Sequence, residues 1–173
     1  MTGQASIRKL RDDDPIPEIT ALLHAAYAPL AAMGFRYTAT HQDDDVTRRR
    51  LDQGRPRVAT LDGRIVATIT LYDTPPEVSN SRWYLKSGVW RFGQFAVRPD
   101  LQGKGLGRRL METVEQEAID GGALELALDT AEGALHLIRW YERLGYRFIE
   151  HADWSTTNYR SVILSKSLPA SPS

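Results

Sequence analysis

One stretch of the sequence, residues 92–118, joins a short apolar run to a glycine-rich turn and a periodic helix. The run Phe92 to Val97 has the character of a buried strand, and Arg98-Pro99-Asp100 ends it because proline cannot donate to a strand ladder. The following helix carries apolar residues on one face at helical spacing, namely Leu106, Leu110, Val114 and Ala118. A strand–turn–helix unit of this kind favours folds in which helices pack against a sheet.

The turn between this strand and this helix has the properties of an anion site. The first four N–H groups of a helix lack intrahelical partners, and the helix dipole places partial positive charge there. Glycines let a phosphate approach the backbone without meeting a Cβ atom. The turn contains three glycines and three basic side chains: Gly103, Gly105 and Gly107, with Lys104, Arg108 and Arg109. We therefore predict a phosphate or pyrophosphate cradle at residues 102–108, with a turn that only satisfies backbone geometry as the alternative.

Two familiar phosphate loops do not fit this turn. The P-loop requires Ser or Thr after its Gly-Lys pair, but Gly103-Lys104 is followed by Gly105. The dinucleotide fingerprint requires a third glycine where this chain has Arg108. A nucleotide-binding protein that prefers ATP or NAD is therefore the weakest of the functional alternatives.

The composition excludes several classes of protein. Lys+Arg and Asp+Glu both number 22 in 173 residues, so no net charge attracts nucleic acid or an anionic membrane. The absence of cysteine excludes disulfides and thiolate metal sites, and the four histidines lack metal-ligand spacing. No apolar run approaches the ~20 residues that span a bilayer, and the N-terminus lacks a secretory signal pattern. We expect a cytoplasmic protein that binds neither nucleic acid, membrane nor metal; a homodimer is compatible with the sequence.

Periodicity and turn residues predict the order strand, two helices, three strands, helix, strand, helix and two strands. Asp62-Gly63 between two alternating apolar runs predicts a hairpin. Asp14 is expected to cap the first helix, and Asp129 stands in capping-box spacing before the last one. We expect one domain over residues 1–168 and a disordered tail over residues 169–173. The predicted strands cover residues 6–10, 57–61, 64–71, 92–97, 123–128, 146–149 and 159–164.

The glycine turn and the element order resemble one known family. Gln102-x-x-Gly105-x-Gly107, directly after a strand and a Val-Arg-Pro turn, is similar to the Gln/Arg-x-x-Gly-x-Gly/Ala motif of the GNAT superfamily of acyl-CoA-dependent N-acyltransferases. The order of elements resembles the GNAT fold over about residues 5–168. The resemblance implies an α/β (mixed α+β) fold with a central mixed, mostly antiparallel twisted sheet of about seven strands and helices on both faces.

The resemblance also implies a cofactor, acetyl-CoA, and a place for it. The backbone amides of Gly103 to Arg108 would hold its pyrophosphate, and the Phe95 to Val97 edge would pair with its pantetheine arm. The implied cofactor-binding residues are Phe95, Ala96, Val97, Gln102, Gly103, Lys104, Gly105, Leu106, Gly107 and Arg108.

A second motif, Tyr141-Glu-Arg-Leu-Gly145-Tyr146, resembles the Tyr-x-x-x-Gly-Phe/Tyr ending of the last GNAT helix. The resemblance implies that Tyr141 protonates the departing coenzyme A sulfur. A phenol, whose ordinary pKa is about 10, can give a proton to a thiolate that forms in a dry site. The alternative is a core aromatic residue at helical spacing.

Two positions depart from the family pattern. Many members have asparagine seven residues before this tyrosine, where this chain has Ala134. Many also place a glutamate base in the central strand, where Gln94 cannot accept a proton. Candidates for the base are Glu77, Glu150 and His151, which the sequence does not rank. These departures keep a catalytically weak acyl-CoA-binding or sensor protein of the same fold as the alternative to an N-acetyltransferase.

The acceptor is predicted only as a class. We expect a primary amine to attack the acetyl thioester directly, and a small amine, an amino acid derivative and a peptide N-terminus all remain open. Aromatic residues of the first helix and of the loops at 73–88 and 151–158 are the candidate acceptor-binding residues, with packing under the loops as the alternative: Tyr27, Trp83, Tyr84 and Trp154.

Overall fold

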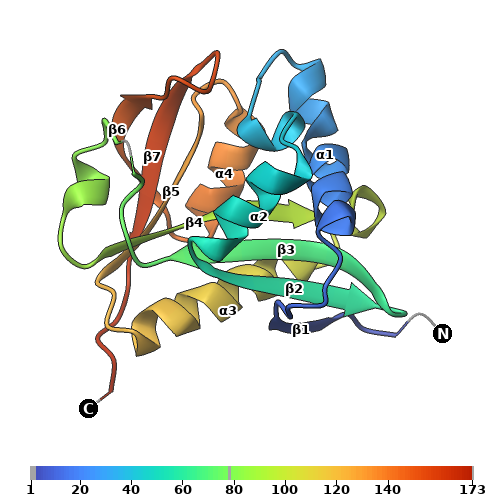
Figure 1. Ribbon diagram of the computed structural model, residues 1–173. Helices are drawn as coiled ribbons and strands as arrows, with labels where there is room; N and C mark the ends of the chain where they lie inside the picture. Colours follow the sequence, from blue (N-terminus) through green and yellow to red (C-terminus); the bar gives the residue numbers. More distant parts are fainter. Residues whose placement is uncertain (1–2, 78, 173) are drawn as a thin grey trace.

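The computed structural model describes residues 3–77 and 79–172, and its centre is a seven-stranded mixed sheet (Figure 1). The strand order is β1-β2-β3-β4-β5-β7-β6. Strands β4 and β5 are parallel, and every other neighbouring pair is antiparallel. The strands are β1 (Ser6–Lys9), β2 (Arg55–Leu61), β3 (Arg64–Tyr72), β4 (Val89–Val97), β5 (Glu125–Ala131), β6 (Arg147–Asp153) and β7 (Arg160–Ser167). The predicted fold class and element order are confirmed.

Helices cover both faces of the sheet (Figure 1). Helices α1 (Ile16–Ala32) and α2 (Asp44–Asp52) share one core cluster with strands β2 to β4. Helices α3 (Leu106–Asp120) and α4 (Leu135–Arg143) pack in a second, larger cluster on the opposite face. Within the described ranges, no helix is long and apolar enough to cross a bilayer. The sheet is therefore buried between two helical layers, which is the arrangement that the hydrophobic pattern favoured.

The hairpin between β2 and β3 forms where the sequence predicted it. Asp62 and Gly63 both adopt positive φ, 50° and 75°, as a type I′ turn requires. The strands pair from Arg55 with Leu71 to Leu61 with Arg64. Local turn chemistry was therefore sufficient to predict this element.

The two predicted carboxylate caps do not form. Pro15 is the N-cap of α1, and the Asp14 carboxylate instead accepts two hydrogen bonds from Arg8, each 2.8 Å long. These bonds lower the pKa of Asp14 and tie β1 to the start of α1. Asp129 lies inside β5, because pairing with β7 continues that strand to Ala131. Tertiary pairing therefore overrides the local capping pattern.

Candidate active site

Strands β4 and β5 part in the middle of the sheet. They pair only from Val89–Glu125 to Arg91–Ala127, although both strands continue for several residues beyond that point. We call the region beyond the last pair the strand opening. The peptide groups that face it have no ladder partner in the other strand, so they are free to bond a ligand or a side chain. One of them, the Ala131 N–H of β5, donates to the Tyr37 hydroxyl at 3.1 Å.

A β-bulge marks the strand opening on the β4 side. The register between β3 and β4 shifts between Thr68 and Thr70, and Gln94 adopts a φ of 50°. The Gln94 side chain is 3% exposed and lies against the side chains of Gln42 and Arg50. A left-handed conformation is costly for a residue with a Cβ, so this packing has to hold it. The buried Gln94 side chain therefore stabilises the bulge in β4.

The predicted phosphate turn presents its backbone to solvent. Gly103 and Gly105 have φ of 75° and 87°, and an added Cβ atom at either would meet no other atom within 4 Å. The N–H groups from Gly103 to Arg108 make no hydrogen bond within the described chain, and the first helical bond runs from Arg109 N to Gly105 O at 3.1 Å. A run of free amides at a helix N-terminus can bind a diphosphate.

Side chains anchor this turn to β4, and two of its three basic residues remain near the free amides. The Gln102 amide donates to the Val97 carbonyl at 3.0 Å, which joins the turn to the end of β4. Lys104 and Arg108 are exposed, and Arg108 reaches Glu112 on the next helical turn at 3.3 Å. Arg109 points elsewhere, because its guanidinium donates to the Ala5 carbonyl at 3.0 Å. The turn therefore keeps two of its three predicted cations.

Tyr141 lies in α4 with its ring in an aromatic cluster and its hydroxyl free. The ring is tilted toward Phe92 and Tyr146, with centroids 6.1 and 5.9 Å away. Within the described residues the hydroxyl has no hydrogen-bond partner, and it is not among the polar atoms sealed from solvent without one. Burial raises the pKa of Tyr141 well above its ordinary value, and Tyr27 and other nearby groups add to the shift. The phenol is thus neutral at physiological pH and can donate a proton.

Asp129 is the site residue whose position the sequence reasoning missed. It lies in β5, beyond the last residue paired with β4, where the strand borders the strand opening. Its side chain is exposed, although the neighbouring strand residues are buried. The Tyr84 hydroxyl donates to its carboxylate at 2.8 Å. Surrounding protein raises its pKa, while the Tyr84 bond and the charges of Arg91 and Arg50 oppose the rise. A carboxylate that is crowded by protein yet reached by solvent can accept a proton from a bound amine.

Three of the four predicted acceptor residues gather near Asp129. Tyr84 stacks with Trp154, with ring centroids 6.2 Å apart and 20° between the planes. The Trp154 indole N–H is close enough to lower the pKa of Asp129, but its geometry falls short of a complete hydrogen bond. The indole N–H therefore has no hydrogen-bond partner within the described residues. The pKa of Tyr27 is raised mainly by burial, and Asp129 contributes.

Trp83 belongs to the same apolar cluster as Tyr84 and Trp154, but its ring faces cations. It lies below the ammonium of Lys86, 4.6 Å from the centroid, and 5.8 Å from the Arg147 guanidinium. Its backbone N–H donates to Glu150 at 2.9 Å. Trp83 therefore packs under its loop and against β6, which is the alternative to a role in acceptor binding.

The three side chains considered as bases are engaged elsewhere. Glu150 accepts from the Ser81 hydroxyl at 2.8 Å as well as from Trp83 N. Glu77 accepts from Gln53 at 3.3 Å, and the His151 ring lies 3.5 Å from Glu132. The Glu150 bonds fasten the 73–88 loop to β6. In the sequence, the feature that could have indicated Asp129 as the base is its position: it is a charged residue directly after the apolar run Leu126 to Leu128.

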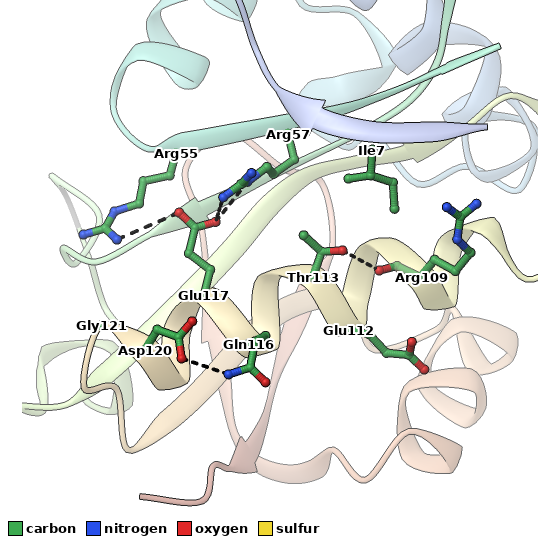
Figure 2. A pocket seen from close by; sticks show the side chains of 10 residues that line it. All are labelled: Ile7, Arg55, Arg57, Arg109, Glu112, Thr113, Gln116, Glu117, Asp120 and Gly121. Carbon is green, nitrogen blue, oxygen red and sulfur yellow. Dashed lines mark hydrogen bonds and ion pairs between the residues drawn. The ribbon is translucent and has the colours of Figure 1, made fainter. Parts of the chain in front are cut away.

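A separate hollow of about 810 Å³ lies between α3 and strands β1 and β2 (Figure 2). Figure 2 shows Arg57 and Arg55 both turned toward Glu117, at 3.0 and 3.9 Å. These charges compensate one another, and of the residues predicted for the site only Arg109 lines the hollow. Size alone therefore does not indicate where the chemistry takes place.

The sequence is similar to those of known acetyltransferases. Residues 18–146 match the model of the acetyltransferase (GNAT) family. S-(2-succino)cysteine N-acetyltransferase of Bacillus subtilis is 35% identical over 79% of this chain and 79% of its own length. S-alkylcysteine N-acetyltransferase of the same organism is 24% identical over 81% of this chain and 78% of its own length.

Solved structures share the fold at low sequence identity. The ribosomal-protein-S18-alanine N-acetyltransferase of Escherichia coli matches with a TM-score of 0.72 at 17% identity, over 98% of this chain and 97% of that one. A GNAT family acetyltransferase of Elizabethkingia anophelis with acetyl-CoA bound matches with a TM-score of 0.66 at 17% identity, over 95% and 98%.

Proposed function

Because this chain belongs to the acetyltransferase (GNAT) family, we propose that it transfers an acetyl group from acetyl-CoA directly to the amino group of a small amino acid derivative. One observation carries the proposal. The free amides of the phosphate turn, the free hydroxyl of Tyr141 and the exposed carboxylate of Asp129 all border the place where β4 leaves β5. Donor binding and both proton transfers can therefore take place within one site.

The chain's own groups suit the acetyl donor. The amides of Gly103 to Arg108 would hold the pyrophosphate, with Lys104 and Arg108 adding charge. The β4 edge from Phe95 to Val97 would pair with the pantetheine arm, since it faces the strand opening without a partner strand. The bound donor supplies an acetyl thioester that an amine can attack.

The proposed chemistry needs one base, one oxyanion site and one acid. Asp129 takes a proton from the acceptor ammonium, and its raised pKa makes it a better base than an ordinary aspartate. As the amine nitrogen bonds to the acetyl carbon, N–H groups of β4 stabilise the oxyanion. Tyr141 then donates its proton to the sulfur as the carbon–sulfur bond breaks. The adduct nitrogen gives up its second proton to restore the Tyr141 phenol, and Asp129 releases its proton to solvent. The products are the amide and free coenzyme A.

S-substituted cysteines are the first acceptors to test, because two relatives carry such substrates in their names. The aromatic side chains of Tyr27, Tyr84 and Trp154 offer apolar surface near Asp129 that a thioether substituent could contact. Peptide N-termini and simple amines belong in the same panel, since the sequence left them open.

The test is an acceptor panel in which release of free thiol from acetyl-CoA is measured. We expect S-substituted cysteines to give the highest kcat/KM, with one acetyl group added at nitrogen by mass spectrometry. A protein that binds acetyl-CoA in calorimetry but releases thiol with no member of the panel would be the acyl-CoA-binding sensor instead.

A further inference from the structure

Two arginine side chains lie within electrostatic reach of Asp129 but form no ion pair with it or with any other carboxylate that the structure describes. Arg50 donates from Nη1 to the Gln42 side-chain oxygen at 2.7 Å, and the Gln94 oxygen accepts from its Nε at 2.8 Å in the amide orientation that hydrogen bonding favours. Arg91 donates to the Thr74 carbonyl at 3.2 Å. Neither forms an ion pair among the residues that the structure describes. Both are therefore held in place by neutral groups.

Partial burial makes this charge costly, and a cation–π contact offsets only part of the cost. The Arg91 guanidinium lies over the Tyr72 ring, 4.2 Å from the centroid, and the Tyr72 hydroxyl donates to the Arg50 carbonyl at 2.8 Å. Burial lowers the pKa of Arg91, and the nearby charge of Arg50 acts in the same direction. Partly buried cations of like sign in one place are unfavourable unless an anion joins them.

The strand register places these cations beside Asp129. Arg91 is the last β4 residue paired with β5, opposite Ala127. Asp129 follows two residues later, so it projects from the same face of the sheet as Ala127 and Arg91. Both Arg91 and Arg50 lower the pKa of Asp129, which places them within electrostatic reach of it. Glu150 also lies near Tyr84, but Ser81 and Trp83 already occupy its carboxylate.

We propose that Arg50 and Arg91 bind the α-carboxylate of the acceptor while Asp129 faces its amino group. This inference rests on the proposed function and deepens it by naming the acceptor as an α-amino acid. An α-amino acid carries a cation and an anion on one carbon, so its site needs both signs side by side. Guanidinium groups suit the anion because they donate two parallel hydrogen bonds to a carboxylate.

Three matched acceptors test the proposal on the unaltered protein. S-methylcysteine has the carboxylate, S-methylcysteine amide replaces it with a neutral group, and S-methylcysteamine lacks it. Because hydrogen bonds to charged groups are the stronger ones, we expect a kcat/KM about 10- to 100-fold higher for the acid than for either analogue. Rates are compared at equal concentrations of the unprotonated amine, so that differences in amine pKa among the three acceptors do not contribute.

Two variants assign that preference to the arginines. Arg91→Gln and Arg50→Gln should each reduce kcat/KM for the acid about 10-fold or more, and change the rate with the cysteamine less than threefold. Arg49→Gln is the matched control, because Arg49 is an exposed neighbour on the same helix. Acetyl-CoA affinity by calorimetry should be the same in Arg91→Gln and Arg49→Gln as in the parent, which separates loss of the carboxylate site from misfolding. Arg50→Gln also removes a contact that holds Gln94, so Arg91→Gln is the deciding variant.

Equal use of the acid and the cysteamine by the unaltered protein would overturn the carboxylate site and leave the acetyltransferase proposal standing. A preference for the acid that survives in Arg91→Gln would also overturn it, since Arg91 does not contribute to the Gln94 packing. If none of the three acceptors releases thiol, the proposed function fails, and the carboxylate site fails with it.

Discussion

The phosphate turn and the acceptor side of the site are built in opposite ways. The turn is one contiguous segment, and what it offers is backbone: free N–H groups held open by glycines at positive φ. The acceptor side offers side chains that come from separate elements: Tyr27 from α1, Arg50 from α2, Arg91 from β4, Asp129 from β5 and Tyr84 from the 73–88 loop. A backbone site keeps its function while side chains vary, whereas the acceptor side can change specificity through single substitutions.

The comparison predicts that the largest kinetic effect comes from a side chain at the junction of the two regions. Tyr141→Phe should lower kcat by about 10²–10⁴-fold, because the sulfur would leave without a proton donor. Acetyl-CoA affinity should stay within about twofold, since the proposed binding contacts come from the phosphate turn. Initial rates of thiol release measure kcat, and calorimetry measures acetyl-CoA affinity. Tyr146→Phe is the control: it removes a hydroxyl that donates to Glu115 at 2.9 Å, outside the proposed chemistry. Unchanged turnover in Tyr141→Phe would remove this residue from the mechanism.

The next effect concerns the base. Asp129→Asn should lower kcat/KM about 100-fold and abolish the acidic limb of its pH profile, because activity falls as pH drops through the Asp129 pKa. The Tyr84 hydroxyl can still donate to the asparagine oxygen, so folding is preserved. A pH–rate profile that keeps its acidic limb in the variant would contradict the assignment.

The same variant makes a stability prediction with a definite sign. The folded protein raises the pKa of Asp129, so folding disfavours its charged form. This cost is absent well below pH 4, where the carboxyl group is protonated in both states. It grows as pH rises from the unfolded-state pKa of about 3.9 to the raised folded pKa, and it is constant above that. Asp129→Asn should therefore be at least as stable as the parent at neutral pH. Urea unfolding at several pH values tests whether the advantage disappears in acid.

A smaller effect is expected from the phosphate turn. Gly105→Ala should lose about 1–2 kcal/mol of stability, because alanine disfavours a φ of 87°. Its KM for acetyl-CoA should rise severalfold with kcat little changed. Gly63→Ala has the same type of strain in the β2–β3 hairpin, so it should lose similar stability without a change in KM. If both variants raise KM equally, the turn has no special part in donor binding.

The smallest predicted effect separates the two tryptophans. Trp154→Phe should raise the acceptor KM about two- to tenfold, since Trp154 stacks on Tyr84 beside Asp129. Trp83→Phe should change it less than twofold, because the Trp83 ring faces Lys86 and Arg147 and makes no ring contact with Tyr84. Initial rates over a range of acceptor concentrations distinguish them, and the reverse ranking would move the acceptor side toward β6.

Much of the fold could be predicted because its signals are local. The Asp62-Gly63 hairpin, the strand before Pro99 and the helix from Leu106 all follow from turn chemistry and periodicity over a few residues. The errors occurred where a distant strand competed with a local pattern. Asp129 fits a helix cap in sequence, but pairing with β7 keeps it in the sheet and makes it part of the site.

The sequence by itself determined the phosphate turn, since glycine positions set φ, and φ sets where the free amides point. It also determined that Tyr141 ends a helix beside a glycine. Only the tertiary structure decided which carboxylate and which cations lie together on the proposed acceptor side. These groups are up to 79 residues apart in the chain, from Arg50 to Asp129. Their proximity results from strand order and from the parting of β4 and β5, which no short stretch of sequence encodes.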